Sequence, residues 1–362
     1  MITTIRRFCS RLLSNKKYCY IALATIAVIL ICIVCVAGVR QKKKIKEIRI
    51  GICLHSDTEI FVNSIVKNMK EWCRNKENQI GVRMTLDVVT AKDSQLEQND
   101  QVDDFVKRGY DVICVNLVDR SDASTIIDKA MEANTPVVFF NREPVEEDLD
   151  RWDGLYYVGA AAEQSGRLQA EIIIDKLSDS EIFDTYDINH NGVIQYVILE
   201  GETGHQDAII RTRVVTNELK SAGFELEKLG DEYANWSRDQ AKTKMKSLIE
   251  KYPFQIEMVI ANNDEMALGA IEALEEYKYP INPLVMGIDG TDEGLEAVRV
   301  GKLDGSVYND AKGQAETIMR IAYAQAVHNP IPEDITLYFG KYAYLPYAKI
   351  TYENVQNFIS EK

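Results

Sequence analysis

The stretch "IEMVIANND", residues 256–264, is an apolar run that ends in two amides and a carboxylate. A short apolar run of this kind predicts a buried β-strand. The segment that follows it, "EMALGAIEAL", has the length and composition of a helix. A buried strand followed by a helix is the repeating unit of a parallel sheet, so this stretch predicts an α/β fold.

The same unit recurs along the chain from residue 48 onward. A first series has apolar strand-like runs at residues 48–54, 83–89, 110–118 and 136–141. A second series has them at residues 193–201, 224–230, 256–264, 283–289 and 304–310. Two such series predict two doubly wound lobes, each built on a parallel sheet. No flexible linker separates the series, so we expect the lobes to be closely joined.

The N-terminus differs in composition from the rest of the chain. A short basic segment, residues 1–19, precedes twenty uncharged residues, 20–39, which are followed by a basic linker, residues 40–47. Twenty apolar residues are long enough to cross a bilayer as a helix, which predicts a membrane anchor. Cleavage as a signal peptide near Ala37 and Gly38 is the alternative. Basic residues flank the span equally on both sides, so charge does not orient it.

Charge excludes one class of partner for the soluble part. Ten of the 42 basic residues but only one of the 56 acidic residues lie in residues 1–47, which leaves a net charge of −23 on the remainder. Such a surface repels nucleic acid. Three of the seven cysteines lie beyond the apolar span, and they imply no disulfide framework.

Polar residues follow the predicted strands where each strand ends. They are Asn141, the run from Asn262 to Asp264, Asp289, and the pair Asn309 and Asp310. In open parallel sheets ligands bind beyond the carboxyl ends of the strands, so these residues are expected to line one crevice. Amides and carboxylates with few cations suit a neutral polyhydroxylated ligand, since each hydroxyl both donates and accepts. The alternative is that they only begin turns or cap helices.

Two further groups of residues have a binding and a structural interpretation. His205, Asp207 and Arg211 follow the strand of residues 193–201, and Asp207 with Arg211 could simply form an exposed ion pair at a helix start. Phe61 and Trp236 lie near helix starts and could belong to the core. Two aromatic rings would also stack on the apolar faces of a sugar.

The stretch "DINHNGVIQ", residues 187–195, has the first part of an EF-hand calcium loop. Oxygen-bearing side chains occupy the first, third, fifth and ninth positions, and glycine occupies the sixth. The twelfth position, where a bidentate glutamate closes such a loop, is Ile198. A calcium site here therefore needs a carboxylate from elsewhere; otherwise the stretch is an Asx-rich turn.

No catalytic motif is present in the sequence. It has no G-x-S-x-G elbow, no P-loop, no H-E-x-x-H pair and only four histidines. We therefore expect a binding protein rather than an enzyme.

Several stretches match a known family in order and spacing. These are "VVFFNREP", "YYVG", "DINHNGVIQYVILEGETGHQDA", "NWSRDQAKTKM", "VIANNDEMALGAIEAL" and "VYNDAKGQA". From residue 48 to the end, the chain resembles the bacterial periplasmic glucose/galactose-binding proteins, the soluble receptors of an ABC sugar importer and of sugar chemotaxis. A sugar-responsive repressor has similar lobes, but it would need a helix-turn-helix where this chain has an apolar span.

The resemblance implies a particular architecture and role. The N-terminal lobe would comprise residues 48–159 and 311–344, and the C-terminal lobe residues 160–310 and 345–362. Three segments would join them, near Val158–Ala160, Asn309–Ala311 and Tyr344–Pro346. The protein would act as a monomer outside the cytoplasm, closing around D-galactose or D-glucose to deliver it to an importer permease. A tethered sensor that signals to a chemotaxis or two-component receptor is the alternative.

The resemblance also implies the site residues. Those for sugar binding are Glu59, Phe61, Asn141, His205, Asp207, Arg211, Trp236, Asn263, Asp289 and Asn309. Those for one structural calcium ion are Asp187, Asn189, Asn191, the Val193 carbonyl, Gln195 and a bidentate Glu257.

This chain departs from the family at two of these positions. Glu59 replaces an aspartate that holds the sugar 4-hydroxyl and lets both epimers bind, which leaves the preferred epimer open; Asp57 is a possible substitute for it. Asn191 replaces another aspartate, so the calcium site has one charge fewer and is expected to be weaker.

Overall fold

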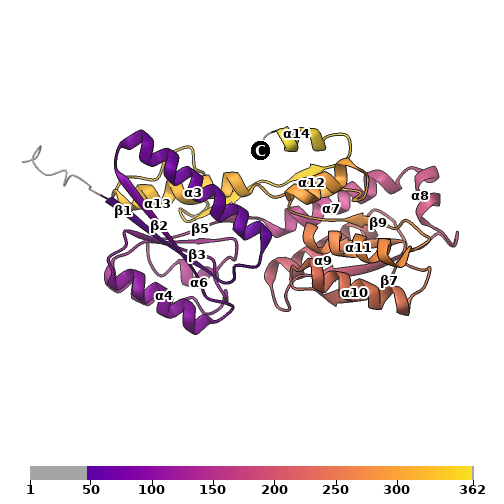
Figure 1. Ribbon diagram of the computed structural model, residues 1–362, viewed down its shortest axis with the longest axis horizontal. Coiled ribbons are helices and arrows are strands. Elements are labelled where there is room, and N and C mark those ends of the chain that lie inside the picture. Colours follow the sequence, from indigo (N-terminus) through magenta and orange to yellow (C-terminus); the bar gives the residue numbers. More distant parts are fainter. Residues whose placement is uncertain (1–46, 361–362) are drawn as a thin grey trace, which may run out of the picture. The chain divides into compact units, whose positions relative to one another are not determined.

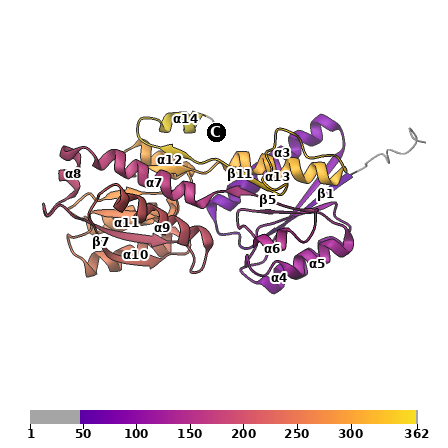
Figure 2. The same cartoon turned by 180° about the vertical axis from the view of Figure 1, so that it is seen from behind.

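A computed structural model describes residues 47–360 (Figures 1 and 2). The predicted anchor of residues 20–39 and the alternative cleavage site lie outside this range. Within it, none of the helices combines the length and the apolar character that crossing a membrane requires.

The first lobe is built on one six-stranded sheet in which every pairing is parallel. In sheet order its strands are β11 (Tyr342–Leu345), β5 (Leu155–Ala160), β4 (Val137–Phe140), β3 (Val112–Val115), β1 (Glu47–Leu54) and β2 (Arg83–Thr90). Its helices are α3 (Ile60–Ile80), α4 (Gln95–Lys107), α5 (Ser124–Ala133), α6 (Glu146–Leu149) and α13 (Ala311–Ala326).

Helices cover both faces of this sheet because its strands are apolar on both sides. Ile50 and Ile52 of β1 pack in the core beneath α3 and α13, whereas the next residue, Cys53, packs on the opposite face toward α4 and α5. Gly51 lets α4 approach closely, since a Cβ at this position would lie 2.6 Å from the Phe105 ring.

The second lobe has a parallel four-stranded sheet and a separate two-stranded sheet. The larger sheet contains, in order, β7 (Leu226–Tyr233), β6 (Ile194–Glu200), β8 (Met258–Ala261) and β9 (Leu284–Met286). The smaller one pairs β10 (Ser306–Tyr308) with β12 (Ala348–Ile350). The helices are α7 (Ala162–Leu177), α8 (Ser180–Tyr186), α9 (Gln206–Ser221), α10 (Arg238–Lys251), α11 (Asp264–Tyr277), α12 (Asp292–Arg299) and α14 (Val355–Ser360).

Two core clusters again lie on the two faces of the larger sheet. Val197 and Leu199 of β6 pack with residues of α10 and α11, while Tyr196 and Ile198 pack with residues of α7 and α9. The prediction of parallel α/β sheets is therefore confirmed.

The chain passes from one lobe to the other at three places. It does so between β5 and α7, between β10 and α13, and between β11 and β12. Strand β11 returns from the end of the chain to pair with β5, placing Tyr342 beside Tyr157. The family resemblance implies connections near these segments, and their role as hinges stays a prediction.

Residues 304–310 lie beside the larger sheet, as predicted. Gly305 forms a parallel bridge with Met286, and Tyr308 forms one with Asp289. Backbone hydrogen bonds support this pairing, from Asp304 N to the Val285 carbonyl at 2.9 Å and from Asp289 N to the Val307 carbonyl at 2.8 Å. In addition, β10 pairs antiparallel with β12.

Candidate functional site

A pocket between the lobes contains about 400 Å³ of unfilled space, part of it open to solvent. Its lining residues are Glu59, Ile60, Phe61, Asn141, His205, Asp207, Arg211, Trp236, Asn263, Asp289 and Asn309. The fold thus brings together all ten side chains that the sequence singled out for sugar binding, and adds Ile60. Their role in binding remains a prediction.

The first lobe supplies its lining residues from a helix start and a strand end. Glu59 is the N-cap residue of α3, yet its side chain makes no capping bond and is available to the pocket. Asn141 follows β4 with a positive φ of 63°, and its Oδ1 accepts from Asn116 Nδ2 at 3.0 Å. The proposed substitute for Glu59, Asp57, is exposed and does not line the pocket.

The second lobe combines helix capping with pocket lining. Asn263 caps α11 by accepting from Met266 N at 2.9 Å, and His205 caps α9 by accepting from Asp207 N through Nδ1 at 3.1 Å. Asn309 caps no helix; its Oδ1 accepts from Gln314 Nε2 at 2.6 Å. Capping therefore accounts for part of the strand-end pattern, but it does not remove these side chains from the pocket.

Arg211 is not an exposed ion-pair residue. Its side chain is buried, and it donates to the Asn262 carbonyl at 2.8 Å and to the Tyr347 hydroxyl at 3.0 Å. Its Nη2 lies 3.6 Å from Asp207 Oδ2. Its Nε is buried without a protein partner in the described chain, so one donor stays available. The exposed ion-pair interpretation of Asp207 and Arg211 is therefore wrong.

Burial shifts the pKa values of several side chains that line the pocket. Desolvation raises the pKa of Asp289 to about 8, although the charge of Arg211 opposes the shift. Desolvation and the nearby Arg142 lower the pKa of His205 to about 3, so this imidazole is neutral. Burial also opposes ionisation of Glu59, but its hydrogen bond to His55 and the charges of His55 and Arg142 outweigh this effect and lower the pKa of Glu59 to about 2.

Phe61 and Trp236 line the pocket from opposite lobes, and both also pack on core residues. The Trp236 ring meets the His205 ring edge-on, with 5.0 Å between centroids. Its Nε1 is buried without a protein partner in residues 47–360, which leaves a donor for a ligand or water. Gly201 makes room for this ring, because a Cβ there would lie 2.1 Å from Trp236 Cζ2.

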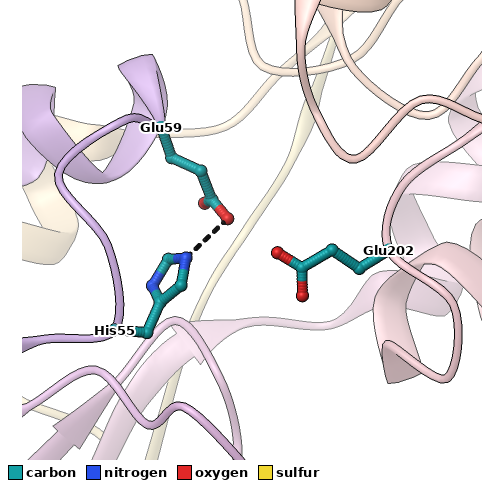
Figure 3. Close-up of side chains that lie close together, drawn as sticks. All are labelled: His55, Glu59 and Glu202. Carbon is teal, nitrogen blue, oxygen red and sulfur yellow. Dashed lines mark ion pairs between the residues drawn. The ribbon is translucent and has the colours of Figure 1, made fainter. Parts of the chain in front are cut away.

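Sequence reasoning missed a polar cluster beside Glu59 (Figure 3). His55 Nε2 lies 3.0 Å from Glu59 Oε1, and Arg142 Nη2 lies 3.1 Å from the same oxygen. Arg142 Nη2 also donates to Glu202 Oε1, on the other lobe, at 2.8 Å. The signal that could have indicated Arg142 is its position directly after Asn141 in "VVFFNREP".

His55, Glu59 and Glu202 offer ligand atoms that lie within 4.8 Å of one another, which is a spacing suited to a metal ion. However, Arg142 donates to both carboxylates. Because its guanidinium already supplies the positive charge, a divalent cation at the same place would be repelled. We assign no metal to this cluster.

The residues proposed for calcium form a compact loop around two buried carboxylates. Glu257, the residue directly before β8, accepts from Ile188 N at 2.8 Å and from Gln195 N at 2.9 Å, which ties the start of β8 to the loop. Asp187 accepts from Asn191 N and Gly192 N at 3.0 and 2.8 Å. Neither carboxylate forms a salt bridge with a cationic side chain of residues 47–360.

This donor set fits a calcium ion. Burial, together with the nearby charge of Asp187, raises the pKa of Glu257, and the backbone donors oppose this only in part. A hard cation bound by these oxygens would neutralise two buried negative charges that no side chain pairs. Asn189 and Gln195 lie beside them, linked by a 2.6 Å hydrogen bond from Asn189 Nδ2 to Gln195 Oε1.

Comparison with curated proteins finds relatives over most of the chain. The D-galactose/methyl-galactoside binding periplasmic protein MglB of Haemophilus influenzae is 32% identical over 315 residues, which cover 86% of this chain and 92% of the relative. A putative rhizopine-binding protein of Rhizobium meliloti is also 32% identical, over 282 residues that cover 75% of this chain and 82% of the relative.

Solved structures agree on the fold. An ABC transporter solute binding protein from Bacillus halodurans with bound myo-inositol is 29% identical and superposes with a TM-score of 0.73, covering 89% of this chain and all of that one. A protein from Actinobacillus succinogenes with bound D-allose, 21% identical, has a TM-score of 0.70 over 86% of this chain and 99% of its own. The periplasmic binding protein domain model itself matches residues 50–330. Because the family model and these relatives span both lobes, this chain belongs to the periplasmic binding protein family.

Proposed function

We propose that this protein binds a hexose, D-galactose or D-glucose, between its two lobes outside the cytoplasm and delivers it to an ABC importer. The single observation that supports this most is the pocket to which ten amide, carboxylate, cationic and aromatic side chains converge from both lobes. Hydroxyl groups can pair with the acceptors and donors, and the apolar faces of a sugar ring can pack against Phe61 and Trp236.

The relatives support this ligand class. MglB of H. influenzae is named for galactose and methyl-galactoside, and the B. halodurans structure contains myo-inositol. Both ligands are compact polyhydroxylated rings. The galactose relative is more similar in sequence, at 32% identity against 29%, which is why a hexose is proposed before a cyclitol.

Binding of such a ligand would favour the closed arrangement of the lobes. Each lobe contributes only part of the lining, so the ligand is fully contacted only when both lobes surround it. The closed form would present one surface to a permease in the membrane. A sensor receptor could read the same closure, and co-purification with membrane partners separates the two roles.

Two structural elements accompany this function in the proposal. One calcium ion, held by the loop of residues 187–195 and by Glu257, would stabilise the second lobe without touching the sugar. The apolar span of residues 20–39 would tether the lobes to the outer face of the membrane.

Isothermal titration calorimetry tests the proposal directly. Purified full-length protein should bind D-galactose or D-glucose and should bind D-ribose, a pentose, less tightly, because a smaller ring leaves lining groups unpaired. If the protein binds myo-inositol but neither hexose, the proposed ligand class changes from hexoses to cyclitols. No binding of any of the four compounds would refute the proposed function.

A further inference from the structure

The two oxygens of the Glu59 carboxylate have different surroundings. Oε1 is contacted by two donors, His55 Nε2 at 3.0 Å and Arg142 Nη2 at 3.1 Å. A carboxylate oxygen has two lone-pair sites, so these donors occupy both. No hydrogen bond from the described chain reaches Oε2. Since Glu59 lines the pocket, Oε2 is the one acceptor that it can offer to a ligand.

The donors on Oε1 are themselves held in place. His55 Nδ1 bonds Asn116 Oδ1, and the Asn116 amide is oriented by its Nδ2, which donates to the Phe140 carbonyl at 3.3 Å and to Asn141 Oδ1 at 3.0 Å. His55 therefore has a polar partner at each ring nitrogen, which fixes the orientation of its ring.

Arg142 is held equally firmly. Its Nη1 donates to the Val118 carbonyl at 3.1 Å, and the residue is only 8% exposed. Glu59 thus cannot exchange its two oxygens by a simple rotation of the carboxylate, because any rotation would break charge-assisted bonds in a buried setting.

A carboxylate with both oxygens free can accept from hydroxyls at two positions about 2 Å apart, so it tolerates an axial or an equatorial hydroxyl. A carboxylate with one free oxygen can accept a hydrogen bond from only one of these two hydroxyl orientations. We propose that His55 and Arg142 are positioning residues that restrict Glu59 to one acceptor, so that this protein discriminates between two epimers that differ at the hydroxyl facing Glu59. This inference rests on the proposed function.

The test uses full-length protein and four hexoses. D-Galactose, D-mannose and D-allose each differ from D-glucose at one carbon, so calorimetry gives three affinity ratios relative to glucose. In the unaltered protein the ratio for the hydroxyl facing Glu59 should be at least about tenfold, since the wrong epimer leaves a buried charged acceptor unpaired. The variant Glu59→Ala shows which of the three affinity ratios depends on Glu59, because only that ratio should fall toward one.

Arg142→Met then removes one of the two donors from Oε1 and frees a lone pair there. The same ratio should fall to below about threefold, while the other two ratios stay within about twofold of their original values. The matched control is Glu202→Gln, which removes the negative charge of the second acceptor of Arg142 but leaves both donors on Oε1; all three ratios should persist. Should Arg142→Met fail to unfold cooperatively on heating, His55→Leu removes the other donor with the same expected result.

The outcomes separate the two proposals. If the unaltered protein binds glucose and all three epimers within about threefold, or if Arg142→Met leaves every ratio unchanged or lowers all three alike, the positioning role is wrong and the sugar-binding function stands. If the unaltered protein binds none of the sugars, the proposed function fails, and this inference fails with it.

Discussion

Arg142 of the first lobe donates from Nη2 to Glu202 Oε1 of the second lobe at 2.8 Å, so one ion pair bridges the two lobes beside the pocket. The Arg142 side chain is 7% exposed and that of Glu202 33% exposed, which places the pair between a screened surface contact and a buried one. Because the link runs from one lobe to the other, it must break before the lobes separate.

Glu202→Gln should therefore speed ligand release. The neutral amide weakens the bridge, and a pair of this exposure is worth about 0.5–1 kcal/mol, which corresponds to a dissociation rate about two- to fivefold higher. Stopped-flow fluorescence measures this rate. Glu163→Gln removes an exposed contact with Arg213, 3.6 Å away within the second lobe, and should leave the rate unchanged. Equal rates in both variants would mean that the bridge plays no part in closure.

Trp236→Ala should reduce hexose affinity by about 1–3 kcal/mol, the usual loss for a well-packed aromatic contact. Gly201→Ala should have a related effect, because the new Cβ would lie 2.1 Å from the Trp236 ring and must displace it. In a Trp236→Ala background the Gly201→Ala change should cost no further affinity, because its target is gone. Additive losses in the double variant would show that Gly201 acts independently of the ring.

Calcium removal should lower stability without altering sugar binding. A bound ion stabilises the native state in proportion to the logarithm of its concentration over its Kd, so EDTA should lower the Tm. Glu257→Gln should abolish most of that difference, and Asn191→Asp should tighten calcium binding by adding a charged ligand. A Tm that responds to neither EDTA nor added calcium, in metal-depleted protein, would show that residues 187–195 form only a turn.

Stability should fall as pH rises through the range in which Asp289 loses its proton. Its pKa is raised by burial from 3.8 to about 8, so the native state holds this proton more tightly than the unfolded chain. The resulting stabilisation is fully present below pH 3.8 and is lost as pH rises toward 8. Urea unfolding of ligand-free protein at several pH values should give a flatter profile for Asp289→Asn. Asp100→Asn, at an exposed position of α4, should keep the original slope; identical slopes in all three proteins would contradict the assignment.

The full-length chain should fractionate with membranes if residues 20–39 remain as an anchor. Immunoblotting with antibodies against the lobes should find the protein in the membrane pellet, resistant to high salt but released by detergent. Protease should degrade the lobes when it is added to cells whose outer layers have been removed and whose cytoplasmic membrane is intact. Soluble protein with an N-terminus beyond Val39 would instead indicate a cleaved signal.

The order of the buried strands and helices follows from the sequence alone. Runs such as residues 48–54 and 256–264 are apolar enough to require burial, and their alternation with helices leaves a parallel sheet as the simplest arrangement. The sequence also predicts that the polar residues after the strands lie together, because the topology of a parallel sheet places the carboxyl ends of its strands along one edge. The ten lining residues were named from these endings together with the family resemblance.

Other features depend on contacts that no local pattern encodes. Strands β11 and β12 contain only four and three residues. Strand β11 pairs with β5, from which the second lobe separates it in the sequence. Likewise, β10 pairs antiparallel with β12, a contact that the composition of neither segment indicates.

The polar cluster at Glu59 shows the same dependence on tertiary structure. His55 is oriented by Asn116, and Arg142 connects Glu59 with Glu202. His55 and Glu59 are four residues apart, but Asn116, Arg142 and Glu202 lie tens of residues away from them in the chain, so neither spacing nor composition relates these three to Glu59. The sequence determined that a carboxylate would be at position 59; only the folded chain decided that one of its oxygens is taken, because hydrogen bonds depend on where atoms meet in space and not on their order along the chain.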